Sequence, residues 1–185
     1  IQNQLEDLEF YLEALETYGS PVFEVGCGTG RLLIPFAREG FQVTGIDTSR
    51  AMLQIARKKI EQESDEIRKR ITLTFADMRE FQLLPLFKVA VLGCNTFQHL
   101  LTNSEQDQTL SCIYRHLEPE GRLFLQSTHV HFWDHEPDVL YHRGREYHPE
   151  TQHLIDVFYS YHYDYLKQLQ YLHLYLDILD EQEHI

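Results

Sequence analysis

Basic residues are scarce in this sequence, and their scarcity narrows the set of partners. The 185 residues include 16 Lys and Arg against 29 Asp and Glu, which gives a formal net charge of −13 at pH 7. A nucleic-acid backbone would require a concentrated basic face, so we expect no nucleic-acid partner. The basic residues that gather between Arg50 and Arg70 lie on a stretch with amphipathic helical spacing, and we interpret them as its solvated face.

Cysteines and long apolar runs are also few. Cys27, Cys94 and Cys112 are odd in number and lack the spacing of a zinc site, so they indicate neither a disulfide framework nor a bound metal. No stretch approaches the roughly 18 to 20 apolar residues of a membrane span, and the first residues carry no signal-peptide pattern. We therefore expect reduced thiols, a cytoplasmic location and no membrane partner.

What the sequence does contain is a run of glycines at alternate positions. Residues 24–30 read Glu-Val-Gly-Cys-Gly-Thr-Gly, and the expected strand at residues 21–25 runs directly into the first of these glycines. Glycine can adopt positive φ and leaves the backbone bare for a ligand. The apolar helical spacing that comes next predicts a helix, and a strand, glycine loop and helix in this order form the nucleotide-binding unit of doubly wound α/β proteins. An ordinary tight turn is the alternative.

The spacing of these glycines separates two classes of cofactor. A dinucleotide fingerprint has the form G-x-G-x-x-G, in which the third glycine lets the helix pack closely on the strand. Counted from Gly26 the third glycine would be Arg31, and counted from Gly28 it would be Leu33, so neither count fits. An NAD(P)-dependent oxidoreductase is therefore a disfavoured alternative.

The pattern that stands here, E-x-G-x-G-x-G, resembles the first motif of the class I S-adenosylmethionine-dependent methyltransferases. Residues 95–102, Asn-Thr-Phe-Gln-His-Leu-Leu-Thr, are similar to those of small bacterial members that act on small molecules. The resemblance implies S-adenosyl-L-methionine as the cofactor and S-adenosyl-L-homocysteine as its product. It also implies a glycine loop that lies against the amino-acid and ribose parts of a cofactor without phosphate.

Two acidic residues extend the resemblance. Asp47 ends the second expected strand, where a carboxylate accepts both ribose hydroxyls of an adenosine; its alternative role is a helix N-cap, which Thr48 or Ser49 could also provide. Asp77 follows the third expected strand, where the family's acidic residue commonly hydrogen-bonds the adenine amine; its alternative is a plain loop residue. The residues expected at the cofactor are Glu24, Gly26, Cys27, Gly28, Gly30, Asp47, Thr48, Met52, Ala76, Asp77, Met78, Cys94 and Asn95.

Strand-like apolar segments alternate with helical spacing along this part of the chain. The expected strands are residues 21–25, 41–46, 71–75, 87–93 and 122–127. This order predicts an α/β fold with a Rossmann-like doubly wound, mainly parallel sheet, the class I methyltransferase fold. Pro35 falls inside the first helix after the glycine loop and predicts a slight kink there. The turn at residues 117–121 resembles that of the family, with Glu120 where a glycine is more common.

The last third of the chain has a different pattern. Residues 139–147, 153–165 and 170–179 alternate with a period of two and predict a C-terminal antiparallel β meander. We therefore divide the chain into an S-adenosylmethionine-binding core at residues 1–131 and a β extension at residues 132–185. The extension is either a substrate lid or an edge or dimer face, so a homodimer stays open. The family's last core strands have no counterpart here, so we expect the natural chain to extend beyond these residues.

The acceptor side of the site is the least defined. Phe97, His99 and Trp133 are the residues expected at the substrate. His99 and His129 are the candidate general bases, because an imidazole titrates near working pH, although a structural role is the alternative for each. The eleven histidines lack H-E-x-x-H or Cys/His spacing, so no metal site is predicted.

Together these features predict an enzyme that moves a methyl group to a nitrogen or oxygen of a small-molecule acceptor by in-line displacement. The sulfonium already activates the methyl group, so the protein would contribute alignment and water exclusion, without a nucleophile of its own. The alternative from another class is a non-catalytic module that binds the cofactor or a partner.

Overall fold

In a computed structural model the chain forms two units, Ile1–Ser127 and Thr128–Ile185. The structure describes residues 6–128, 136–147, 151 and 153–179. The predicted boundary at residue 131 falls outside these described residues. No helix in the described ranges is long and apolar enough to cross a membrane.

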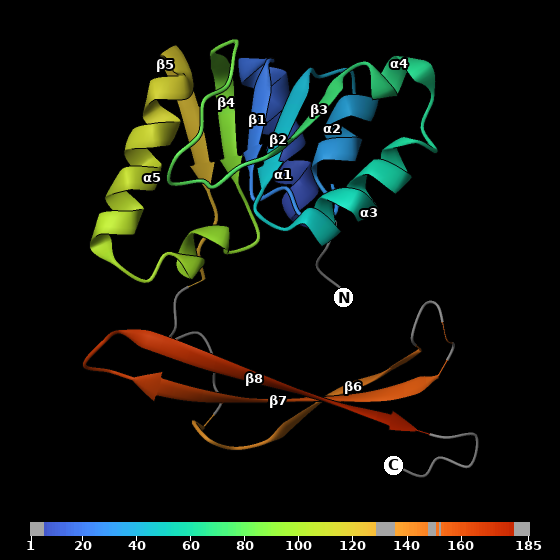
Figure 1. Cartoon of the computed structure of the whole chain (residues 1–185), viewed down its shortest axis with the longest axis vertical. Helices are drawn as coiled ribbons and strands as arrows, with labels where there is room; N and C mark the ends of the chain where they lie inside the picture. The colour runs from blue at the N-terminus through green and yellow to red at the C-terminus, as the bar shows by residue number, and fades with distance from the viewer. Residues whose placement is uncertain (1–5, 129–135, 148–150, 152, 180–185) are drawn as a thin grey trace. The chain divides into compact units, whose positions relative to one another are not determined.

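The first unit is built on a five-stranded sheet in the order β3-β2-β1-β4-β5, with every pairing parallel (Figure 1). Its strands are β1 (Val22–Val25), β2 (Val43–Asp47), β3 (Ile71–Phe75), β4 (Phe87–Leu92) and β5 (Leu117–Leu125). Its helices are α1 (Glu6–Tyr18), α2 (Leu33–Arg38), α3 (Arg50–Ile60), α4 (Asp65–Arg68), the 3₁₀ turn η1 (Thr96–His99) and α5 (Asn103–His116). The doubly wound parallel sheet predicted from the sequence is confirmed.

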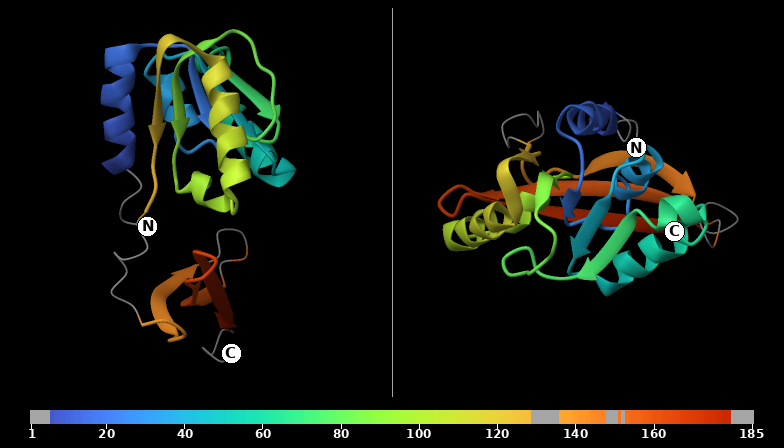
Figure 2. Two further views of the ribbon diagram at one scale, coloured as in Figure 1. Left: turned by 90° about the vertical axis from the view of Figure 1, so that its left-hand side faces the viewer. Right: turned by 90° about the horizontal axis from the view of Figure 1, so that it is seen from above.

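Helices cover both faces of this sheet, so its strands bury side chains on both sides. Val22 packs with Phe36 of α2 and the apolar stripe of α1 on one face. The next residue, Phe23, packs with Ile113 of α5 on the other face. Figure 2 (left) shows α1 and α5 on opposite sides of the sheet. The carboxyl ends of the strands are left to the loops, which is where ligands bind in open parallel sheets.

The second unit is a three-stranded antiparallel sheet, β6 (Tyr141–Tyr147), β7 (Leu154–Asp164) and β8 (Leu169–Leu179), in that order. The predicted meander is confirmed. Tyr159, Tyr161 and Tyr163 fall on one face of β7 with neighbouring rings 5.3 to 6.4 Å apart. Asp156 lies on the other face, where Arg145 binds it through two hydrogen bonds of 2.9 and 2.7 Å.

Candidate functional site

A cavity of about 330 Å³ opens at the carboxyl edge of the parallel sheet. It lies where β1 and β4 are neighbours and the strand order reverses, which is the usual ligand position in this architecture. Residues from the ends of β1 and β2 and from the segments that follow β3 and β4 form its wall. They are Gly26, Gly28, Ile46, Asp47, Thr48, Ser49, Met52, Ala76, Met78, Thr96 and His99.

The glycine loop forms one wall of the cavity, and its glycines are required for different structural reasons. Gly26, Gly28 and Gly30 have φ of +70°, +52° and +78°, a region that side chains disfavour. A Cβ at Gly26 would lie 2.5 Å from Cγ2 of Thr96, so this glycine allows close packing between two loops. A Cβ at Gly28 would meet no atom within 4 Å. Gly28 therefore exposes bare backbone to the cavity.

Asp47 joins the glycine loop to the start of α3. Its Oδ2 accepts a hydrogen bond from the Gly28 amide at 2.9 Å, and its Oδ1 accepts one from the Ser49 amide at 2.7 Å. The N-cap of α3 is Ser49, whose hydroxyl accepts from the Met52 amide, so the capping alternative for Asp47 does not apply. Each carboxylate oxygen can accept a second hydrogen bond, so Asp47 can still take up a pair of ligand hydroxyls.

The opposite wall is apolar. Four apolar side chains form this wall, from the ends of β2 and β3 and the first turn of α3: Ile46, Met52, Ala76 and Met78. Met52 is 45% exposed, so part of its side chain is accessible from the cavity that it lines. An apolar wall beside a carboxylate with free acceptor capacity suits a purine nucleoside.

Asp77 does not line this cavity in the described structure. Arg79 binds its carboxylate at 2.7 to 3.2 Å and lowers its pKa, and the same guanidinium reaches Glu105 at 2.6 Å. Its neighbours Ala76 and Met78 do line the cavity. The adenine contact predicted for Asp77 stays a prediction. In that contact the Asp77 carboxylate would bind both the adenine amine and Arg79.

Glu24 lies beneath the glycine loop as a buried carboxyl. It is 5% exposed, and its Oε2 has no hydrogen-bond partner among the described residues. Burial raises its pKa to about 8, although Arg31 and the Leu33 amide oppose the rise. A buried acceptor without a partner is uncommon, and a cationic ligand in this region would favour the charged form of Glu24.

The segment after β4 brings two further residues to the cavity. Cys94 and Asn95 form a tight turn, and η1 then places Thr96 and His99 in the wall. Phe97, predicted at the substrate, packs instead against the core between the sheet and α5. His129 and Trp133 lie outside the described residues, so their predicted roles stay predictions.

The predicted cofactor residues thus divide into two groups. Gly26, Gly28, Asp47, Thr48, Met52, Ala76 and Met78 line the cavity, with His99 from the predicted substrate residues. Glu24, Cys27, Gly30, Asp77, Cys94 and Asn95 are not among the residues that line it, and their predicted cofactor contacts stay predictions. Sequence reasoning missed Ile46, Ser49 and Thr96. Ser49 could have been found as the N-cap of a helix whose first turn faces the ligand.

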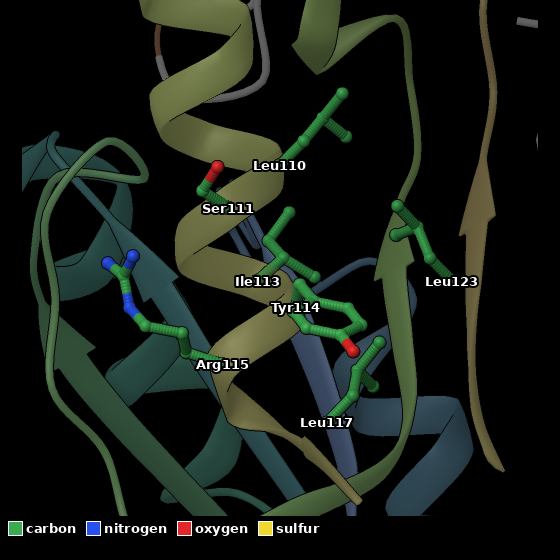
Figure 3. A pocket seen from close by; sticks show the side chains of 7 residues that line it. All are labelled: Leu110, Ser111, Ile113, Tyr114, Arg115, Leu117 and Leu123. Atoms are coloured by element: carbon green, nitrogen blue, oxygen red, sulfur yellow. The ribbon is translucent and has the colours of Figure 1, made fainter. Parts of the chain in front are cut away.

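A larger cavity, of about 530 Å³, lies along α5 and β5. Leu110, Tyr114, Leu117 and Leu123 form most of its wall, while the guanidinium of Arg115 points away from Leu123 (Figure 3). It lacks the convergent polar groups of the smaller cavity. Size alone therefore does not select the functional site.

A family model described as a methyltransferase domain matches residues 22–121, which include all of the sheet's first four strands. This is more than half of the chain, and the chain belongs to this family. It is 35% identical over 132 residues to a Geobacillus sp. (strain WCH70) protein named only as a methyltransferase, a match that covers 68% of this chain and 51% of that protein.

A second relative is the dTDP-3-amino-3,4,6-trideoxy-alpha-D-glucopyranose N,N-dimethyltransferase of Streptomyces venezuelae. The two are 32% identical over 102 residues, which cover 55% of this chain and 40% of the relative. The chain spans about half the length of the curated relatives it matches.

Solved structures share the fold. The CcbJ methyltransferase from Streptomyces caelestis superimposes with a TM-score of 0.78 at 23% identity, over 96% of this chain and 68% of that chain. The glycopeptide N-methyltransferase MtfA, solved in complex with S-adenosyl-L-methionine, superimposes with a TM-score of 0.65 at 21% identity, over 92% of this chain and 75% of that chain.

Proposed function

We propose that this protein transfers a methyl group from S-adenosyl-L-methionine to a nitrogen or oxygen of a small-molecule acceptor. The observation that carries the proposal is the Asp47 carboxylate, which bridges the Gly28 and Ser49 amides at the edge of the cavity. Membership of the methyltransferase domain family supports it. A relative that dimethylates an amino sugar and a structural neighbour solved with this cofactor support the acceptor class and the cofactor.

The residues of the cavity suit the parts of this cofactor. Asp47 would accept the two ribose hydroxyls through the lone pairs that the backbone amides leave over. Met52, Ala76 and Met78 would cover the adenine ring. The bare backbone of Gly28 leaves room for the chain that leads to the sulfur. Among the described residues no Lys or Arg lines the cavity, as expected for a cofactor that carries no phosphate.

The bound cofactor would supply a methyl group activated by a positive sulfur. The task of this chain's own residues is to hold the reacting groups in line and to exclude water, which can contribute roughly 7 to 11 kcal/mol in favourable cases. Asp47 places negative charge at the cavity, and a cationic ligand nearby would lower the raised pKa of Glu24 and favour its charged form. His99, in the cavity wall, is the described candidate for removing a proton from the acceptor.

The second unit keeps two alternatives in the proposal, a substrate lid or an edge or dimer face. Its β7 and β8 carry an aromatic and aliphatic face, with Tyr159, Tyr161, Leu174 and Leu176 on one side of the sheet. Such a face suits an apolar acceptor or a second copy of the chain. A cytoplasmic location completes the proposal.

Calorimetry with the full-length natural chain tests the cofactor assignment. We expect micromolar or tighter binding of S-adenosyl-L-homocysteine and none of NADH. A screen of small amines and hydroxy compounds with methyl-labelled cofactor then tests transfer. Binding of NADH alone, or of neither ligand, would contradict the proposal; binding without transfer to any acceptor would favour a non-catalytic cofactor-binding module.

A further inference from the structure

Two consecutive residues after β4 adopt a backbone conformation that non-glycine residues avoid. Cys94 has φ of +52° and Asn95 has φ of +57°. The left-handed region crowds the Cβ of an L-residue against its own backbone; Asn adopts it more readily than most residues, but Cys does so rarely and is held there by its surroundings. This Cys94–Asn95 turn therefore has a structural cause that must lie in its neighbours.

Two side chains from other elements hold the turn. The amide of Cys94 donates a hydrogen bond of 2.7 Å to Oε1 of Gln126, just beyond β5. Nη2 of Arg31, from the segment between the glycine loop and α2, donates to Sγ of Cys94 at 2.7 Å. Arg31 is fixed in turn by Asp7 of α1, which accepts from both terminal nitrogens at 2.8 and 2.6 Å. A guanidinium whose two terminal nitrogens are both bound by one carboxylate cannot rotate freely, so its contact with Cys94 links the turn to α1.

The turn determines where part of the cavity wall lies. Thr96 follows it directly and donates its amide to the Gly93 carbonyl at 3.1 Å. Thr96 and His99 both line the cavity, and Thr96 occupies the space that a side chain at Gly26 would need. A relaxed turn would move Thr96 against the glycine loop.

We propose that Arg31 is a positioning residue for cofactor binding, which acts by holding the Cys94–Asn95 turn in its left-handed conformation. This inference rests on the proposed function, because the cavity is the cofactor site of that proposal. Arg31 does not line the cavity. Arg31 acts on Cys94, and the position of Cys94 determines where Thr96 and His99 lie in the cavity wall. Asp7 and Gln126 also help to hold the turn.

The chain offers a matched control. Arg38 of α2 makes a similar paired contact with Glu63, at 3.2 and 2.5 Å, and lines no part of the cavity. Arg31→Ala and Arg38→Ala thus each remove one arginine–carboxylate pair. Arg31→Lys keeps the charge but loses the fork that reaches Asp7 and Cys94 together, and it serves where Arg31→Ala does not fold.

The experiment combines calorimetry with S-adenosyl-L-homocysteine and amide hydrogen exchange of the ligand-free full-length chain. We expect Arg31→Ala and Arg31→Lys to weaken binding at least tenfold and to reduce the protection of the Cys94, Thr96 and Gln98 amides, which all donate hydrogen bonds within or beside the turn. Arg38→Ala should keep the wild-type affinity and protection at these three amides.

Two results would overturn the inference. One is an Arg31 variant that melts at a lower temperature but binds within threefold of the wild type, which would make Arg31 a general stabiliser. The other is unchanged protection of the three amides in the Arg31 variants. If the wild-type chain itself fails to bind the ligand, the proposed function fails, while the exchange result still decides whether Arg31 holds the turn.

Discussion

The carboxylate of Asp47 accepts a hydrogen bond of 2.9 Å from the amide of Gly28, which lies on a different strand–helix loop. This bond fixes the glycine loop relative to the end of β2. It also orients the carboxylate so that a ligand meets an acceptor that is already in place. Asp47, which we assign to the ribose, therefore also holds the glycine loop of the same site in place.

Replacement of Asp47 by Asn should weaken cofactor binding more than it weakens the fold. The amide keeps one acceptor oxygen, for either the Gly28 or the Ser49 amide, and presents an NH2 group where the second carboxylate oxygen accepted, so it also loses acceptor capacity for the ribose. We expect S-adenosyl-L-homocysteine to bind about 10- to 100-fold more weakly, since a hydrogen bond to a charged group contributes about 1.5–3 kcal/mol. Asp107→Asn, on the exposed face of α5, is the control in the same titration. Equal affinities of the two variants for S-adenosyl-L-homocysteine would show that Asp47 does not bind the cofactor.

Gly28 and Gly40 make a matched pair that separates backbone strain from obstruction of the cavity. Both have positive φ, and a Cβ at either would meet no atom within 4 Å. Alanine at either position should cost about 1–2 kcal/mol of stability, measured by urea unfolding, because of the left-handed backbone. Only Gly28 lines the cavity, so only Gly28→Ala should weaken S-adenosyl-L-homocysteine binding, by at least tenfold. Comparable losses of affinity in both variants would show that strain alone is responsible.

Much of the fold follows from sequence patterns that act locally. Apolar runs bounded by glycine predict β1 and β4, because both are buried on both faces. The glycine loop and the acidic residue that ends β2 likewise predict the cavity. Pro35 lies in the first turn of α2, where proline is tolerated, and the slight kink expected there stays a prediction.

Contacts between distant segments could not be predicted in this way. Gly45 reads as an ordinary strand residue, yet a Cβ there would lie 2.8 Å from the side chain of Cys27, beneath the glycine loop. The ion pair between Arg31 and Asp7 joins α1 to the turn before α2, and the distance between these segments depends on the finished sheet. Asp77 matched by position, but the nearby Arg79 engages its carboxylate. These features depend on tertiary geometry that no local pattern records.

The buried carboxyl of Glu24 should make stability depend on pH. Its folded-state pKa of about 8 lies above the ordinary value of 4.5, so the folded state binds the proton more tightly than the unfolded state. The stability linked to this proton is fully present below pH 4.5 and is lost as the pH rises through 8. Wild-type stability should therefore fall over this window.

Glu24→Gln removes this titration while keeping the shape of the side chain. Its advantage over the wild type should be small near pH 4.5 and should grow to a few kcal/mol by pH 9, on the order of 1.4 kcal/mol per pKa unit. Thermal unfolding across this range measures it, with Glu16→Gln on the exposed face of α1 as the control. A difference between Glu24→Gln and wild type that does not change with pH would mean that Glu24 keeps an ordinary pKa in the folded chain.

Glu120 allows the cost of a left-handed backbone conformation to be measured at a position outside the cavity. It has φ of +67°, its side chain is 92% exposed, and its one ion pair, with Arg122, spans 3.9 Å. Glycine adopts this conformation without the Cβ penalty of about 1–2 kcal/mol, although it loses about 0.5–1 kcal/mol of chain entropy on folding. We therefore expect Glu120→Gly to stabilise the chain by about 0.5–1 kcal/mol in urea unfolding. Glu118→Gly, two residues earlier in β5 and without positive φ, should destabilise it instead, and destabilisation by both would show that the side chain of Glu120 outweighs its backbone strain.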